Sequence, residues 1–422
     1  MRKQNDLGAR QRHHYYFKNG SLDFLAGCLL GYAQQGGMSP GELYHCFNQI
    51  NEHEPASWVQ SFNTMLAYQQ AQAQYYEQQG EQRAAAARWM AASVAARAAM
   101  HILDPRSITA RAITSALEQA FQQALTCGNI PLQAWNIPFG ENYLPSYVSP
   151  NLEETATLFV VIGGGDTYRE DLWFFGGKAA LEHGYALLMV DLPGQGSTPY
   201  QGMHFGPGTL AALNTALQAV VTRGFKGSMI LCGWSGGGYF VTKYMQQLDS
   251  TQSHQIKAWI ASTPVYDMAE LMRVAMPSLL RTNPSGWWQQ QLTQLAGRMN
   301  PVLAAALCKY NWQFGPAGLA AALTTFEHLA KVDIQELHTP MLALVGLSES
   351  LEGRRQAQVV YEAVSRRQPC SALLNFPAES GADAHCQVNN LPLACQHIFG
   401  WLGRLGLKPP ASSRGITTES GC

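Results

Sequence analysis

The stretch Met229–Phe240, Met-Ile-Leu-Cys-Gly-Trp-Ser-Gly-Gly-Gly-Tyr-Phe, constrains the fold more than any other part of the chain. Its apolar run stops at Gly233, and an amphipathic segment begins beyond Gly238. Gly233-Trp-Ser-Gly-Gly237 fits the pattern G-x-S-x-G, a tight strand-to-helix turn that presents a serine at the carboxyl edge of a sheet. The amino end of the following helix suits a developing oxyanion. A non-catalytic, glycine-rich connection between a strand and a helix would have the same pattern, so evidence from the rest of the chain is needed to distinguish the two.

Composition narrows the class of protein. With 422 residues, 46% of them hydrophobic and 14% charged, the chain can bury a large core and form one large domain with an addition. A net charge of −1 does not indicate a nucleic-acid or membrane partner. The nine cysteines include no C-x-x-C pair and no zinc-type spacing, and the first 17 residues lack the apolar core of a signal peptide. We therefore expect a cytoplasmic protein with unpaired thiols.

The first third of the chain is predicted to be helical. Residues 1–15 are expected to be a flexible arm, and residues 16–130 an N-terminal helical domain. Ser39-Pro-Gly-Glu42 has the form of a helix start, with a Ser cap and a Glu three residues later. Two long segments, 55–79 and 81–103, meet at Gly80 and predict an antiparallel helix pair. A further helical segment covers residues 107–126.

Beyond Gly128 the periodicity changes to that of strands. Residues 132–137 and 144–148 predict a hairpin, and helical patterns then separate six apolar runs: 158–162, 186–190, 229–232, 259–261, 342–345 and 373–376. Such an alternation predicts a mainly parallel sheet covered by helices on both faces. We assign residues 131–407 to an α/β-hydrolase catalytic domain with a helical, aromatic cap inserted at about 268–332. Residues 408–422 are expected to be a disordered tail.

Two further side chains are expected to act with Ser235. Glu349 lies in the turn after an apolar strand that ends near Gly346, and Glu352 is a nearby competitor; either could instead be a solvated charge. His385 lies in a polar loop between the last apolar run and a final helix. Ser235, Glu349 and His385 thus follow the Ser…Asp/Glu…His chain order of this fold. Agreement of three separate placements favours a catalytic triad over a structural turn.

A second glycine-rich turn, Gly163-Gly-Gly-Asp166, follows an earlier strand, where hydrolases place one donor of the oxyanion hole. Backbone N–H groups of Gly164 or Gly165 would act together with that of Gly236. A tight strand exit is the structural alternative. Asp166 and Glu170 are interpreted as the N-terminus of a helix rather than as catalysts. The turn Asp191–Gly196 is interpreted as scaffold.

The chain resembles, over nearly its whole length, the serine α/β-hydrolases typified by 2,6-dihydropseudooxynicotine hydrolase, and it is similar to fungal enzymes that shorten polyketide pigment precursors. The features that carry the resemblance are, in order, Gly36-Gly37, Pro55-Ala-Ser-Trp58, Pro138…Leu144-Pro145, Gly163-Gly-Gly-Asp166…Glu170, Gly233-Trp-Ser-Gly-Gly237, Asn311-Trp-Gln-Phe-Gly315 and Gly381…His385-Cys386-Gln387. The resemblance implies a triad of Ser235, His385 and an acid, a helical cap and a homodimer. Glu349 departs from the family, which usually has Asp at this position.

The resemblance also implies hydrolysis of a C–C bond beside a carbonyl, or of an ester, in a small molecule. No metal or organic cofactor is implied. An acyltransferase, cyclase or thioesterase of secondary metabolism would use the same triad, and a carrier protein is then a candidate partner. A peptidase is a weaker alternative because no propeller-like repeat precedes the catalytic domain. A non-catalytic interaction protein is the alternative from another class. Candidate substrate-binding aromatics, most of them expected to be ordinary core, are Trp234, Trp287, Trp288, Trp312 and Phe314.

Overall fold

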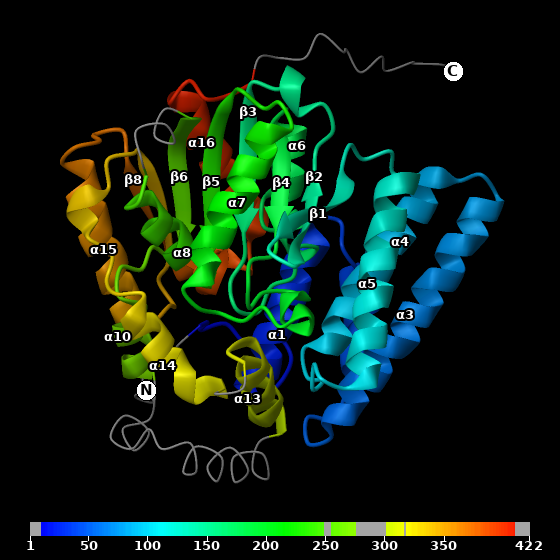
Figure 1. The fold of residues 1–422 in the computed structure, drawn as a ribbon. Helices are drawn as coiled ribbons and strands as arrows, with labels where there is room; N and C mark the ends of the chain where they lie inside the picture. The colour runs from blue at the N-terminus through cyan, green and yellow to red at the C-terminus, as the bar shows by residue number, and fades with distance from the viewer. Residues whose placement is uncertain (1–9, 249–254, 276–300, 316–317, 410–422) are drawn as a thin grey trace.

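The computed structural model describes residues 10–248, 255–275, 301–315 and 318–409 (Figure 1). Its centre is an eight-stranded sheet in the order β1-β2-β4-β3-β5-β6-β7-β8. The first three strands of that order pair antiparallel, and all later neighbours pair parallel. The strands are β1 (Gln133–Phe139), β2 (Asn142–Val148), β3 (Thr157–Ile162), β4 (Ala186–Val190), β5 (Ser228–Trp234), β6 (Ile256–Ser262), β7 (Met341–Gly346) and β8 (Ala372–Phe376).

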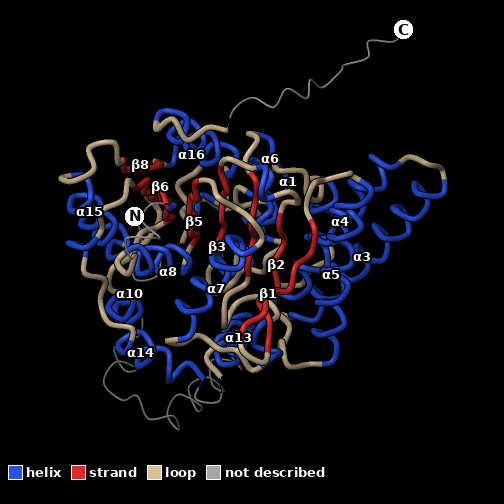
Figure 2. Tube along the Cα trace, turned by 45° about the horizontal axis from the view of Figure 1, so that its top comes forward, coloured by secondary structure: helices blue, strands red, loops and turns tan. Residues whose placement is uncertain are grey.

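Helices cover both faces of this sheet because its central strands are apolar on both sides. Ile230 and Cys232 of β5 point into one core cluster, and Met229 and Leu231 point into the other. The first cluster includes residues of α6 (Gly177–Glu182) and α16 (Leu391–Arg404). The second includes residues of α7 (Gly208–Thr222), α8 (Gly236–Met245) and α15 (Leu351–Ser365). In Figure 2 the strands, in red, form one layer with helices on both sides. This is the predicted α/β-hydrolase architecture.

From residue 10 onward, where the description begins, five helices precede the sheet: α1 (Gly20–Gln34), α2 (Pro40–Asn48), α3 (Pro55–Gln78), α4 (Gln82–Met100) and α5 (Ile108–Cys127). The capping box expected at Ser39 and Glu42 is present, with both reciprocal hydrogen bonds. Helices α3, α4 and α5 stand beside the β1 and β2 edge of the sheet (Figure 1). The helix pair α3–α4 is hinged at Gly80, whose φ of 77° suits a residue without a Cβ.

Three helices of the predicted cap lie within the described residues: α10 (Met268–Ala275), α13 (Pro301–Gln313) and α14 (Gly318–His328). They occupy the interval between β6 and β7 and lie beyond one end of the sheet (Figure 1). Within the described ranges, no helix is long and apolar enough to cross a membrane.

Residues 10–15, the part of the expected flexible arm that is described, have specific partners. The carbonyl of Arg10 accepts a hydrogen bond from the backbone N–H of His385, and His13 contacts Asp383. The sequence predicts a flexible arm here because no local pattern reveals these contacts, which join segments more than 360 residues apart. The expected disordered tail lies outside the described residues from residue 410 onward.

Candidate active site

The turn between β5 and α8 gives Ser235 an unusual backbone. Its φ is 55° and its ψ is −123°, a conformation that non-glycine residues rarely adopt. The turn is tight on both sides: a Cβ on Gly233 would lie 2.3 Å from the carbonyl oxygen of Gly237, and one on Gly237 would lie 2.4 Å from that of Ile162. Glycine is therefore required at both positions. Strain of this kind persists where the surrounding structure enforces it, as at active sites.

The structure brings the other two candidate catalytic side chains to this serine. His385 begins a short 3₁₀ turn after β8, and its Nε2 lies 2.9 Å from Ser235 Oγ. Its Nδ1 lies 3.3 Å from Oε2 of Glu349, which follows β7. The other carboxylate oxygen of Glu349 accepts a hydrogen bond of 2.8 Å from Thr263 Oγ1, which fixes the orientation of this longer side chain.

Two competing carboxylates are directed elsewhere. Glu352 on α15 accepts hydrogen bonds from Arg355 and Gln356. Asp383, two residues before His385, is fully buried and contacts Ser348, Asn389 and His13. Of the two glutamates that the sequence left open, the geometry places Glu349 against the imidazole.

The charge state of His385 follows from these contacts. Burial alone lowers the pKa of the imidazole, but Cys386 and the Glu349 carboxylate raise it by more, so the pKa lies well above its ordinary value. A carboxylate stabilises a nearby imidazolium because opposite charges attract strongly in a buried setting. The arrangement therefore suits a histidine that takes a proton from Ser235 and holds it.

Side chains hold four successive backbone carbonyls of the loop 163–166, which we call the oxyanion loop. Gln195 Nε2 donates to the Gly163 oxygen at 2.5 Å, and Thr167 Oγ1 donates to that of Gly164 at 3.3 Å. Gln313 Nε2 donates to the Gly165 oxygen at 2.5 Å, and Arg97 donates to that of Asp166. Because a peptide group is planar and trans, fixing each carbonyl also fixes the direction of the next N–H.

The backbones of the three predicted oxyanion-hole glycines meet beside Ser235. A Cβ on Gly164 would lie 2.6 Å from Ser235 Cβ and 2.9 Å from the nitrogen of Gly236. A Cβ on Gly236 would lie 3.6 Å from the nitrogen of Gly165. Gly236 is the first residue of α8, where helix geometry leaves the N–H without an intrahelical partner. The site can therefore present backbone donors to an oxygen next to the serine.

Asp166 and Glu170 do not form the helix N-terminus that the sequence suggested. The Asp166 carboxylate contacts Lys309, Arg10 and Tyr310. Burial raises the pKa of Asp166, but Lys309 and Arg10 lower it by more, so it stays ionised. Glu170 precedes a single 3₁₀ turn and accepts hydrogen bonds from Tyr147 and Arg169 instead of capping it. For Asp166 the cations that explain the correction, Lys309 and Arg10, come from distant segments, whereas Glu170 binds the adjacent Arg169 and Tyr147 of β2.

The candidate substrate-binding aromatics have different environments. Trp234 is fully buried in the core against Phe175 rather than directed toward the side chains of Ser235 and His385, because it continues the side of β5 that carries Ile230 and Cys232. Phe314 packs against Phe205 and Phe326, and Trp312 against Tyr200. Trp312 also lines a small cavity of about 10 Å³ together with Gly165 and Gln313. Trp287 and Trp288 lie outside the described residues.

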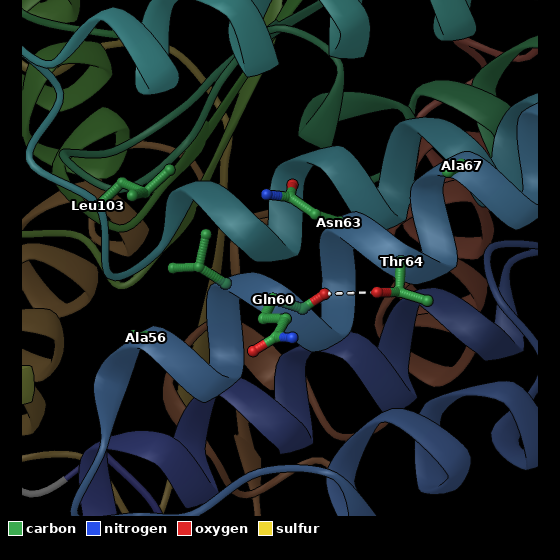
Figure 3. Close-up of a pocket in the computed structure, with 7 residues that line it drawn as sticks. Ala56, Gln60, Asn63, Thr64, Ala67 and Leu103 are labelled. Carbon is green, nitrogen blue, oxygen red and sulfur yellow. Dashed lines mark hydrogen bonds between the residues drawn. The ribbon is translucent and has the colours of Figure 1, made fainter.

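A separate hollow opens on the helical region, away from these residues. This groove of about 750 Å³ runs along α3 (Figure 3). Thr64 in it donates to the backbone oxygen of Gln60 on the same helix. None of the side chains near Ser235 lines this groove. Its lining residues are Ala56, Val59, Gln60, Asn63, Thr64, Ala67 and Leu103.

The family of the chain follows from comparison with known proteins. The model of the serine aminopeptidase S33 hydrolases matches residues 156–374, just over half of the chain. The chain belongs to this family. The matched residues run from β3 to β8 and include Ser235 and Glu349 but not His385 or the N-terminal helices.

Relatives of this S33 hydrolase extend the similarity to the whole chain. Hydrolase ORFZ of Pyricularia oryzae is 24% identical over 434 residues, covering 94% of this chain and 99% of the relative. Hydrolase phmG of Phaeosphaeria nodorum is 23% identical, covering 97% and 98%. The crystal structure of 2,6-dihydroxy-pseudo-oxynicotine hydrolase superposes with a TM-score of 0.63 at 16% identity, covering 90% of this chain and 97% of that one. The chain is therefore a hydrolase of α/β-hydrolase type, related to fungal hydrolases.

Several neighbours of the site had no signal of their own in the sequence. Arg97, Gln195, Thr263 and Gln313 contact the oxyanion loop or Glu349 from four different parts of the chain. Two of them lie in stretches that the sequence does single out: Gln195 in the turn after β4, interpreted there as scaffold, and Gln313 in Asn311–Gly315, one of the features that carry the family resemblance.

Proposed function

We propose that this protein is a serine hydrolase that acts through an acyl-enzyme. The observation that carries the proposal is the 2.9 Å contact between His385 Nε2 and Ser235 Oγ at a strained strand-to-helix turn. A nucleophile, a base in hydrogen-bond reach and a third group that orients the base form the recurrent arrangement of nucleophilic catalysis. Glu349 is the proposed third group, and its contact with Nδ1 leaves Nε2 for the serine.

In the proposed reaction, Ser235 Oγ attacks a carbonyl carbon while His385 takes the hydroxyl proton. The carbonyl oxygen becomes an oxyanion, which the N–H groups of Gly236 and of Gly164 or Gly165 stabilise. The intermediate then collapses, the bond to the leaving group breaks, and His385 returns the proton to that group. Water activated by His385 attacks the acyl-enzyme and releases a carboxylic acid and free Ser235.

We propose as substrate a ketone or ester of an aromatic or polyketide-like small molecule, within secondary metabolism. Two similarities support this class: the fold matches an enzyme named for a pseudo-oxynicotine substrate, and full-length relatives are fungal hydrolases. For a β-diketone or aryl ketone the leaving group is a carbanion, so His385 would protonate carbon rather than oxygen. For an ester it would protonate an alkoxide.

Intact mass after treatment with a small fluorophosphonate tests the nucleophile. We expect one adduct on the wild type and none on Ser235→Ala, because the reagent reacts with an activated serine. An unmodified wild type would contradict the proposed mechanism and favour a non-catalytic interaction protein.

Isotope labelling separates hydrolysis from acyl transfer. With a panel of β-diketones, aryl ketones and esters in H₂¹⁸O, hydrolysis by the wild type should place one ¹⁸O atom in the released carboxylic acid. A product that carries the acyl group on another nucleophile, without ¹⁸O, would indicate an acyltransferase or cyclase with the same three residues.

A further inference from the structure

Residues 10–17 form a segment, which we call the N-terminal strap, that lies along α1. Its anchor is Asp23, a carboxylate with a relative exposure of 3%. The two oxygens of Asp23 accept hydrogen bonds from the backbone N–H groups of Tyr15, Tyr16 and Phe17, at distances between 2.7 and 3.2 Å, and from Gln11 Nε2 at 2.9 Å. Charge-assisted hydrogen bonds are about twice as strong as neutral ones, so one buried carboxylate fixes the path of the strap.

The strap contacts the segment 383–389, which carries His385 and which we call the histidine loop. The carbonyl oxygen of Arg10 accepts the backbone N–H of His385 at 2.7 Å. His13 Nε2 lies 2.9 Å from Oδ1 of Asp383, a fully buried side chain. Asn389 then closes the loop on itself, since its amide donates to Asp383 at 3.0 Å and accepts from the N–H of Ala384 at 3.2 Å.

The strap also contacts the other half of the site. The Arg10 guanidinium lies 3.6 Å from the Asp166 carboxylate, at the end of the oxyanion loop. One residue therefore contacts both the base-bearing loop, through its main chain, and the oxyanion loop, through its side chain. These contacts come from outside the sheet and its connections, since the strap ends more than 100 residues before the first strand begins.

We propose that the N-terminal strap is a positioning element of the active site, which holds His385 at the geometry required by Ser235 and Glu349. This inference rests on the proposed serine-hydrolase function. The strap touches the histidine backbone and Asp383 rather than the reacting atoms, so Arg10 and His13 are positioning residues. A displacement of about 1 Å in a catalytic group can cost roughly 10²-fold in rate, and Cys386 of this loop is a free thiol, so no disulfide at that residue restrains such a shift.

Two full-length variants loosen the strap without touching Ser235, His385 or Glu349. His13→Ala removes the contact with Asp383, and Asp23→Ala removes the anchor on α1. We expect the second-order rate constant for fluorophosphonate labelling of Ser235 to fall about 10- to 100-fold in each. The apparent pKa of that rate should also fall toward the ordinary histidine value, since the Glu349 contact that raises it weakens. His13→Gln, which retains a donor of similar reach, should restore most of the rate.

The matched control is Asp333→Ala, which removes a carboxylate that likewise accepts a backbone N–H, from Gln335, on a turn outside the site. It should label at the wild-type rate. If the wild type is labelled at Ser235 and both strap variants have the same rate and pH profile as the wild type, the strap inference is wrong but the proposed function stands. The inference is also wrong if labelling is slow, the melting temperature falls sharply and His13→Gln does not restore the rate. The strap would then stabilise the fold without positioning His385. A wild type that is not labelled would overturn the proposed function, and the inference with it.

Discussion

Two glutamates only three positions apart, Glu349 and Glu352, have different partners, and this difference decides which of them can orient His385. Glu349 lies in the turn before α15, where its carboxylate reaches His385 and is held by Thr263. Glu352 lies in the first turn of α15, where Arg355 binds it with contacts of 2.7 and 2.8 Å and lowers its pKa. The helix therefore directs the second glutamate along its own surface, and only the first is available to orient an imidazole.

Replacing each glutamate by glutamine tests this difference. Glu349→Gln should lower the rate of Ser235 labelling roughly 10²- to 10⁴-fold, because a neutral amide neither stabilises the imidazolium nor enforces the correct tautomer. Glu352→Gln is the matched control and should stay within about threefold, since an exposed ion pair contributes little. Stopped-time mass spectrometry of the labelled fraction gives both rates. Equal losses in the two variants would contradict the assignment of Glu349.

The raised pKa of His385 predicts a pH profile. Only the neutral imidazole can accept the serine proton, so labelling should increase with pH through an apparent pKa above the ordinary value of 6.5. In Glu349→Gln the same transition should move to lower pH, because the carboxylate that favours the charged form is gone. Rates measured from pH 5 to pH 10 at constant ionic strength would show this. A profile with its transition below 6.5 in the wild type would contradict the prediction.

Some residues of the site could be predicted from the sequence and others could not. Ser235 sits in a local pattern, and His385 and Glu349 follow from the order of strands along the chain. Trp234 was expected to face substrate, but the alternation of β5 directs it into the core. Choosing between Glu349 and Glu352 required knowing where α15 begins, which is decided by the Ser350 cap. Arg10 and His13 reach the site through contacts that no local pattern encodes.

At the scale of elements, the oxyanion loop is held from outside itself. Three of the four side-chain donors to its carbonyls come from α4, the turn after β4 and α13, and the fourth is the adjoining Thr167. Because Gln313 binds both Gly165 and Gly194, the last turn of α13 links the loop to the turn that holds Gln195. The strands and most helices could be predicted from hydrophobic periodicity. These bridges could not, since a glutamine in an apolar helix gives no sign of what its amide contacts.

Gln313→Met removes this link while preserving the size of the side chain. We expect the labelling rate to fall about tenfold, less than for loss of an oxyanion donor itself, because the N–H of Gly165 remains but is less well oriented. The affinity for a non-reactive substrate analogue should change little. Gln358→Met on the exposed face of α15 is the control and should behave as wild type. A rate for Gln313→Met equal to that of this control would show that α13 does not order the loop.

At the scale of the whole molecule, the helical region and the hydrolase core meet through a buried ion pair. Arg97 of α4 donates to Asp171 Oδ2 at 2.7 Å, and their side chains are 5% and 2% exposed. Arg97 also binds the carbonyl of Asp166 in the oxyanion loop. The core cluster on that face continues from α1–α5 into the sheet without a gap. We infer that the helical region unfolds together with the core rather than as a separate unit.

A double-mutant cycle on this pair tests that inference. Arg97→Met should lower the free energy of unfolding by about 3–5 kcal/mol, because it leaves Asp171 buried without its cation. Asp171→Asn added to it should recover part of the loss, since the remaining amide is neutral and can still accept the Tyr168 N–H. Urea unfolding followed by both far-UV circular dichroism and tryptophan fluorescence gives the free energies. In the wild type the two probes should report one transition, because the N-terminal helices share a core cluster with Trp234 of β5. Two separated transitions, or a cost below about 1 kcal/mol for Arg97→Met, would show instead that the helical region is an independent appendage to the site.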